Sequence, residues 1–167
     1  MRIANKKVFF YGTSSIFSNW HKCRFTINGI SYNCSEQAMM HLKAKMFKDD
    51  ETAIKILRTN NPREQKRLGR EVKNFDQKFW DEQKEELMFR ILLEKFDQNK
   101  DFKDELLKYT DYEFVEASPY DRIWGIGLEE NNDLILDEDN WKGENLLGKA
   151  ITKVCKILGN ETSKEVL

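Results

Sequence analysis

Residues 34–47 read CSEQAMMHLKAKMF, and their periodicity decides how the middle of the chain folds. One face of a helix over this stretch would carry Glu36, Met39, Met40, Lys43 and Phe47. Three of these five side chains are large and apolar, so we expect the face to point into a core. A carboxylate and an amine are unusual on such a face, because charged side chains are seldom buried.

The spacing of Glu36 and Lys43 places both groups toward one space. Seven residues turn a helix by about 700°, so the two directions differ by about 20° and the Cα atoms lie about 10.5 Å apart along the axis. Apolar surroundings lower the pKa of an amine and raise that of a carboxylate, which suits a nucleophilic lysine and a general acid or base. In the structural alternative, Glu36 only favours the helix N-terminus and Lys43 extends past Met39 and Phe47 to solvent.

The composition indicates one globular domain spanning residues 1–167, with 40% hydrophobic and 34% charged residues. A net charge of −1 gives no overall attraction to nucleic acid or to an anionic membrane, although a local basic groove is compatible with it. Cys23, Cys34 and Cys155 form no CxxC pair and the chain has two histidines, so we expect no metal site, no disulfide framework and a cytoplasmic protein. The N-terminus lacks the apolar run of a signal peptide, and no stretch has the ~20 apolar residues of a membrane helix.

The remaining patterns predict an α+β fold, mostly helical, with a small antiparallel sheet. Ser35 is the expected N-cap of the first helix, and Phe79 is expected on the buried side of the longest one. Helices are predicted over residues 35–47, 50–58, from Pro62 onward, 76–96, 102–109 and 143–158. Strands are predicted over 7–11, 24–27, 30–32 and 113–116, with Asn28-Gly29 as a tight hairpin turn. Residues 117–141 show no clear periodicity, which is typical of a functional or disordered loop.

Three further clusters combine polar groups with aromatic residues or glycines: FSNW at 17–20, YDRIWGIG at 120–127 and GENLLG at 143–148. Asp121 could lie beside the aromatic wall of Trp124, and Gly125 could let backbone approach a ligand. Asn145 could bond a ligand hydroxyl near a helix N-terminus, and Arg67 or Arg70 could reach a phosphate. Each cluster also has a structural interpretation as a turn, a helix start or a solvent-exposed face.

In this order, these clusters resemble the NADAR family, also called YbiA-like, over about residues 8 to 155. The matching stretches are FSNW at 17–20, Ser35-Glu36-Gln37 with Lys43 seven residues after the glutamate, Leu68-Gly69-Arg70, Trp80, DRIWG at 121–125 and GENLLG at 143–148. The resemblance implies a mostly helical α+β fold and an N-glycosidase that cleaves the bond between a ribose C1 and an amine nitrogen. It implies no metal and no cofactor.

The resemblance also implies two substrate classes: ADP-ribose attached to guanine in nucleosides or DNA, and phosphoribosylaminopyrimidine intermediates of riboflavin synthesis. The first is our expectation and the second is the alternative. This chain departs from the family pattern at Gln37, where histidine is frequent, at Tyr120, where asparagine is frequent, and in a longer, more acidic segment at 129–141. These departures bear on the choice of substrate.

Site roles follow from the resemblance and the chemistry of the residue types. Lys43 is the expected main catalytic residue, either attacking C1 after the sugar ring opens or acting as a charge or acid at the ribose. Glu36 would be the general base or would tune Lys43, and Asp121 would hold ribose hydroxyls or share proton transfer. The expected substrate-binding residues are Asn19, Trp20, Arg70, Trp124, Gly125 and Asn145, with the two tryptophans as stacking walls. A non-catalytic module that binds ADP-ribose or NAD is the competing hypothesis.

Overall fold

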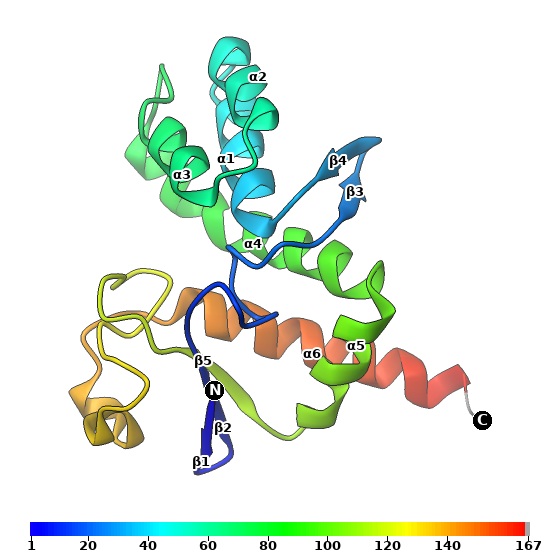
Figure 1. Ribbon diagram of the computed structural model, residues 1–167, viewed down its shortest axis with the longest axis vertical. Coiled ribbons are helices and arrows are strands. Elements are labelled where there is room, and N and C mark those ends of the chain that lie inside the picture. The colour runs from blue at the N-terminus through cyan, green and yellow to red at the C-terminus, as the bar shows by residue number, and fades with distance from the viewer. Residues whose placement is uncertain (166–167) are drawn as a thin grey trace. The chain divides into compact units, whose positions relative to one another are not determined.

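The computed structural model describes residues 1–165 and contains six α-helices and five short strands in that range (Figure 1). The helices are α1 (Ser35–Met46), α2 (Asp50–Arg58), α3 (Pro62–Arg70), α4 (Gln77–Asp97), α5 (Lys100–Leu106) and α6 (Leu146–Glu165). The strands are β1 (Arg2–Ala4), β2 (Lys7–Phe10), β3 (Phe25–Ile27), β4 (Ile30–Tyr32) and β5 (Glu113–Glu116). Three 3-10 turns complete the set, η1 (Leu107–Tyr109), η2 (Asp133–Leu136) and η3 (Glu138–Asn140). The α+β, mostly helical class is therefore confirmed.

The chain forms two compact units, and each is described by itself. Residues 19–98 make one unit, and residues 1–18 together with the chain from Asn99 onward make the other. No helix within residues 1–165 is both long and apolar enough to cross a bilayer.

In the unit of residues 19–98, α1 packs against α2, α3 and α4, and β3 packs against α4. The antiparallel β3–β4 hairpin turns at Asn28 and Gly29, whose φ angles of 50° and 79° are those of the predicted tight turn. The expected N-cap is wrong by one residue. Cys34 caps α1, because its Sγ accepts a hydrogen bond from the Gln37 backbone N at 3.4 Å. Phe79 is also not buried as expected, since 44% of it is exposed.

The start of α1 is tied to the end of α2 by the Gln37 side chain. Its Nε2 donates to the backbone carbonyls of Ile56 at 3.1 Å and of Thr59 at 3.2 Å, and its Oε1 accepts from the Asn33 backbone N at 2.8 Å. The residue that departs from the family pattern therefore fixes the position of the helix that carries Glu36 and Lys43.

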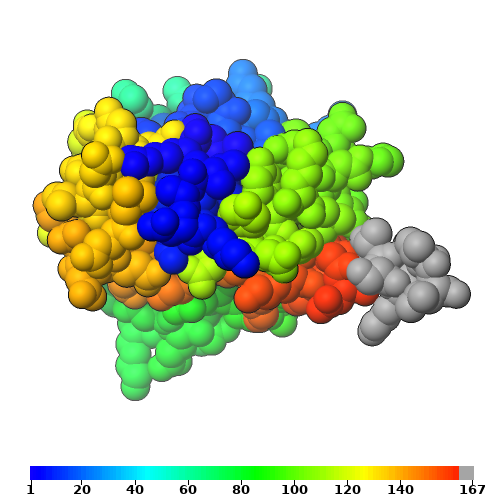
Figure 2. Space-filling view, turned by 90° about the horizontal axis from the view of Figure 1, so that it is seen from below, coloured from blue at the N-terminus to red at the C-terminus, as the bar shows by residue number. Residues whose placement is uncertain are grey.

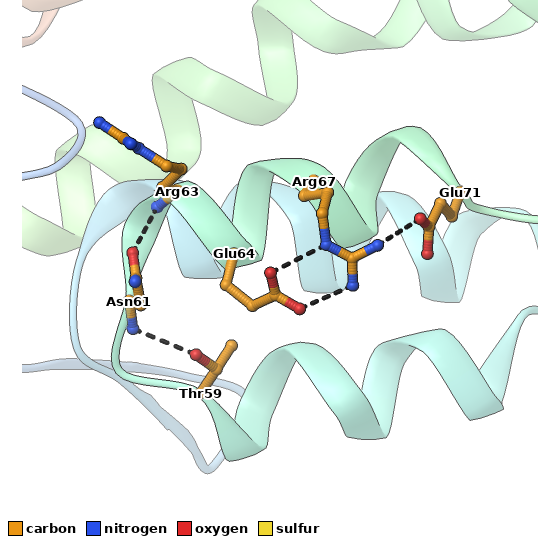
Figure 3. Close-up of polar contacts among 6 residues, drawn as sticks. All are labelled: Thr59, Asn61, Arg63, Glu64, Arg67 and Glu71. Atoms are coloured by element: carbon orange, nitrogen blue, oxygen red, sulfur yellow. Dashed lines mark hydrogen bonds and ion pairs between the residues drawn. The ribbon is translucent and has the colours of Figure 1, made fainter.

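One set of polar contacts caps α3 and runs along its exposed side (Figure 3). Asn61 caps it by accepting from the Arg63 backbone N at 3.0 Å, and Pro62 occupies the first turn, as predicted. Arg67 donates two hydrogen bonds to Glu64, at 2.7 and 2.8 Å, and another to Glu71 (Figure 3). Because its guanidinium is shared between two carboxylates, Arg67 is a poor candidate for a phosphate ligand.

In the other unit, β1, β2 and β5 form a sheet on which α6 packs through β5. The β1–β2 pair is antiparallel, as expected of the small sheet, but β2 and β5 run parallel. Parallel pairing needs a long connection, and here the whole chain between residues 10 and 113 supplies it. The strand β1 was not predicted, because three residues carry too little periodicity to recognise.

Residues 117–141 are a packed segment and not an open loop. Ile126, Leu128 and Ile135 are buried in a core cluster with Phe9, Val115 and Ala117. Figure 2 shows the N-terminal strands in blue, between this segment in yellow to orange and the chain around residues 100–113 in yellow-green. The segment therefore completes the core of its unit around β2 and β5.

Candidate functional site

The carboxylate of Glu36 lies in the first turn of α1 and is almost completely buried, with 7% of the residue exposed. The indole Nε1 of Trp20 donates a hydrogen bond to Glu36 Oε2 at 3.2 Å. The backbone N of Glu36 donates to the Asn19 carbonyl at 2.9 Å, which holds the FSNW segment against the start of the helix. Trp20 thus acts on Glu36 through a hydrogen bond as well as providing an aromatic surface.

Two buried oxygens next to Glu36 lack a hydrogen-bond partner among the described residues: Asn19 Oδ1 and Ser35 Oγ. Only 8% of Asn19 and none of Ser35 is exposed. A buried acceptor that is left unpaired costs about 1–3 kcal/mol. Both oxygens are closed to solvent, so they do not test the predicted substrate-binding role of Asn19, which stays a prediction.

The amine of Lys43 is half-buried and held by groups that favour a cation. Its Nζ donates to the Gly69 carbonyl at 2.8 Å and lies 4.4 Å from the ring centroid of Phe75 and 5.2 Å from that of Trp80. Burial lowers the pKa of Lys43, the charge of Glu36 raises it, and the charge of Arg70 lowers it. The predicted direction of the pKa shift is confirmed, and the ammonium is turned toward Gly69 and two rings.

One unit therefore brings together Asn19, Trp20, Glu36, Lys43 and Arg70, all of which the sequence singled out. Arg70, the last residue of α3, is exposed and acts on Lys43 through its charge. The other four predicted residues, Asp121, Trp124, Gly125 and Asn145, belong to the second unit.

In that second unit, Asp121 closes a turn. Its Oδ1 accepts from the backbone N of Ile123 at 3.0 Å and of Trp124 at 2.8 Å. A Cβ atom on Gly125 would lie 2.9 Å from the Glu116 carbonyl oxygen, so packing alone demands glycine there. The functional roles of Asp121, Trp124 and Gly125 stay predictions.

The Asn145 side chain joins β5 to the start of α6. Its Oδ1 accepts from the Glu116 backbone N and its Nδ2 donates to the Phe114 carbonyl, both at 3.0 Å. The residue is buried, with a φ of 54°. This geometry explains why an asparagine stands here without invoking a ligand, and its predicted contact to ribose or phosphate stays a prediction.

Sequence reasoning missed Phe75 altogether and gave Trp80 no role in the site. Phe75 lies between α3 and α4, outside any periodic pattern. The stretch FDQKFW at 75–80 has three aromatic residues within six positions, and this density was the available indication in the sequence.

A buried glutamate and a half-buried lysine lie on one helix of a mostly helical α+β protein. This pair is typical of a site for acid–base or nucleophilic chemistry. Residues 9–159 match the NADAR domain, so the chain belongs to the NADAR domain family.

Several named relatives and one solved structure are similar to this chain. It is 38% identical over 161 residues to N-glycosidase R617 of Acanthamoeba polyphaga mimivirus, covering 90% of this chain and 95% of that protein. It is 35% identical over 163 residues to Protein irg-1 of Caenorhabditis elegans, covering 88% and 77%. A match to Riboflavin biosynthesis protein VVA0006 of Vibrio vulnificus has 30% identity over 128 residues and covers 75% of this chain but 34% of that protein. The NMR structure of the Escherichia coli protein YbiA superposes with a TM-score of 0.78 at 26% identity, covering 98% of this chain and 90% of that one.

Proposed function

We propose that this protein is an N-glycosidase that hydrolyses the bond between a ribose C1 and an amine nitrogen, with ADP-ribosylated guanine as its substrate. The observation that carries the proposal is the state of Lys43: a half-buried amine with a lowered pKa, seven residues from a buried carboxylate. The names of relatives such as N-glycosidase R617 support the same reaction class. We also propose that residues 1–167 form one domain, which the single family match over residues 9–159 supports. The location is cytoplasmic, which fits three free cysteines.

An N-glycosidic bond breaks when C1 gains positive character and the leaving nitrogen gains a proton. After the sugar ring opens, C1 forms a protonated imine with the base. The neutral amine of Lys43 adds to C1, a proton passes from Nζ to the leaving nitrogen, and the base departs as a neutral amine. A protonated Schiff base between Lys43 and C1 remains. Water then hydrolyses it, which frees the sugar aldehyde and returns the amine.

Each neighbouring group has a part in this sequence. Burial raises the fraction of Lys43 that is neutral and able to attack. Glu36 is positioned by Trp20 to accept a proton from Lys43 or from the attacking water. Asn19, whose backbone carbonyl accepts from the Glu36 backbone N, contributes to substrate binding. Arg70, exposed at the end of α3, attracts the diphosphate.

In the other unit, Asp121 binds ribose hydroxyls or shares proton transfer, and Trp124 offers a stacking surface for the base. Asn145 and Gly125 support these residues by fixing the local backbone. In the non-covalent alternative, the ammonium of Lys43 instead stabilises the leaving group while water attacks C1.

The charge distribution bears on the size of the guanine substrate. A net charge of −1 and the acidic residues between 129 and 139 do not attract long nucleic acids. A nucleoside, a DNA end or an unpaired base is therefore preferred over a duplex interior, where flipping the base costs a few kcal/mol. Phosphoribosylaminopyrimidine is the second candidate, and the similarity to a riboflavin biosynthesis protein favours it. A non-catalytic sensor of ADP-ribose would not require both an amine and a carboxylate.

The test offers the protein ADP-ribosylated guanosine, ADP-ribosylated single-stranded DNA and a phosphoribosylaminopyrimidine in parallel. Free base is detected by mass spectrometry at about 50 mM and about 200 mM salt, a range over which phosphate contacts lose affinity steeply. Release of guanine with little dependence on salt is expected. Release from the pyrimidine alone would overturn the choice of substrate. No release from any of the three, with tight binding of ADP-ribose, would overturn the enzyme assignment in favour of a sensor.

A further inference from the structure

Phe75 is an exposed aromatic residue in contact with the most important amine of the site. The residue is 41% exposed, and the centroid of its ring lies 4.4 Å from Lys43 Nζ. Phe47 packs against it with centroids 5.2 Å apart and the planes at 63°. Single exposed apolar side chains are ordinary on protein surfaces, so the exposure of Phe75 carries no argument by itself. What sets Phe75 apart is the position of its ring over the amine of Lys43.

We propose that Phe75 and Trp80 form an aromatic site for a positive charge, which holds the ammonium of Lys43 in the free enzyme and the cation at ribose C1 during the reaction. The second half of this inference rests on the proposed function. The face of an aromatic ring is the negative end of its quadrupole and attracts a cation within about 6 Å of the centroid. Both rings meet that distance, and the Gly69 carbonyl adds a third negative pole at 2.8 Å.

A positive charge returns to this point when the substrate reacts. The ammonium of Lys43 first gives one proton to Glu36, and the neutral amine then attacks. A protonated imine of the ring-opened sugar arrives with one positive charge on its C1–N group. Nζ forms the new bond to C1, the bond from C1 to the base breaks, and a proton moves from Nζ to the leaving nitrogen. The product is a protonated Schiff base with its positive charge on Nζ and C1. The rings that faced the ammonium therefore face the new cation without rearrangement.

The other groups that act on Lys43 are known and can be held constant. Glu36 raises the pKa of Lys43, whereas burial and Arg70 lower it. Replacing Phe75 by leucine keeps an apolar side chain but removes the ring face. Because the ring favours the charged amine, its loss should lower the pKa of Lys43 further, by about half a unit to one unit.

Phe79 provides a matched control. It is 44% exposed and packs on the same Phe47, with centroids 6.0 Å apart and planes at 82°. Phe79→Leu therefore removes an equally exposed ring from the same cluster. Phe75→Tyr keeps the ring and should behave as the wild-type protein does.

The first experiment follows the labelling of Lys43 by an amine-reactive acylating reagent as a function of pH, with the modified peptide quantified by mass spectrometry. The midpoint is expected to fall in Phe75→Leu and to stay unchanged in Phe79→Leu and Phe75→Tyr. Equal midpoints in Phe75→Leu and Phe79→Leu would overturn the aromatic site. This measurement requires no turnover, so it stands apart from the test of the glycosidase activity.

The second experiment measures kcat and KM of the same variants on whichever N-glycoside the wild-type protein cleaves. Loss of the ring should lower kcat about three- to thirtyfold with little change in KM, because the ring acts on a charge formed during the reaction. A shifted labelling midpoint with an unchanged kcat would overturn the catalytic half of the proposal. Rescue of kcat by Phe75→Tyr, and not by other apolar residues, supports it.

Discussion

The pKa of Lys43 is lowered by burial and by Arg70 and raised by Glu36. Lys43 is therefore the residue to test first. Lys43→Ala should abolish turnover, with a loss of at least about 10³-fold, because both a nucleophile and a local charge disappear. The fold should persist, since only one side-chain hydrogen bond, to the Gly69 carbonyl, is lost among the described contacts. Rates and melting curves of the same preparation are the measurement.

Lys45→Ala is the control for this variant. Lys45 lies two residues further along α1, is exposed and pairs with Asp50, so its removal should leave the rate unchanged. A Lys43→Ala protein that retains a tenth of the wild-type rate would show that Lys43 is not the key residue.

Asp121 has a structural role in its turn and a predicted catalytic role, and one substitution separates the two. In Asp121→Asn, the amide oxygen can still accept the hydrogen bonds from Ile123 and Trp124, so the melting temperature should hold. Loss of the carboxylate should lower kcat about 10²-fold if it takes part in proton transfer. Asp139→Asn, an exposed carboxylate of the same unit, is the control. Full activity of Asp121→Asn would reduce Asp121 to a turn residue.

Some residues of the site could be predicted from the sequence and others could not. Glu36 and Lys43 could be found because helical spacing aligns them, and spacing is readable. Phe75 could not, because its contact with Lys43 depends on how α3 and α4 approach α1. Asn145 shows the opposite case. The sequence indicated an amide free to bind a ligand, but its Oδ1 and Nδ2 both bond to the backbone of β5.

At the scale of elements, α1 and α3 approach closely at Gly69. A Cβ atom there would lie 1.9 Å from Met40 Sδ and 2.8 Å from its Cγ. Gly69→Ala should therefore destabilise the protein by about 1–3 kcal/mol, since a well-packed contact is overfilled. Activity should fall as well, because the Gly69 carbonyl is the acceptor for Lys43. Denaturant titration and kcat are the measurements.

Shortening the partner side chain tests this explanation. Met40→Ala in the Gly69→Ala background removes the sulfur that the new methyl group meets, so part of the lost stability and activity should return. If the double variant is less stable by the sum of the two single changes, the contact between Met40 and Gly69 is not the cause.

Most helices were predictable because their caps and periodicity are local. Asn61-Pro62 and the alternation around Asn28-Gly29 fixed α3 and the β3–β4 hairpin correctly. The errors lie where the outcome depends on distant partners. Phe79 has the helical spacing of a buried residue, but it is 44% exposed on α4. The parallel pairing of β2 with β5 joins segments whose sequences give no indication of direction.

For the molecule as a whole, the completely buried Lys95 of α4 makes the free energy of unfolding depend on pH. Burial lowers the pKa of Lys95 from 10.5 to about 8, against the opposite influence of Cys23 and Cys34. Between these two values the unfolded chain binds more protons than the folded one, so stability rises with pH. Below pH 8 the full cost of burying the ammonium applies. Lys95→Met should therefore stabilise the protein near neutral pH by about 1–3 kcal/mol and flatten this dependence.

Denaturant titrations at about pH 7 and about pH 9.5 would measure both effects. Lys100→Met is the control, since the side chain of Lys100 is 83% exposed and should change little at either pH. A Lys95→Met protein that is less stable near pH 7 would show that the buried amine makes a bond worth more than its desolvation.

The parallel pairing of β2 with β5 also has a consequence for biosynthesis. A ribosome adds about 5–20 residues per second, so the roughly 100 residues between these strands delay their meeting by about 5–20 s. Residues 19–98 are continuous, and all of them are synthesised before β5. During that interval β2, with its apolar Val8-Phe9-Phe10, has only β1 as a sheet partner and presents an unpaired edge. The edge of β2 is accordingly open to wrong pairing until β5 is made, although β2 lies in the centre of the finished sheet.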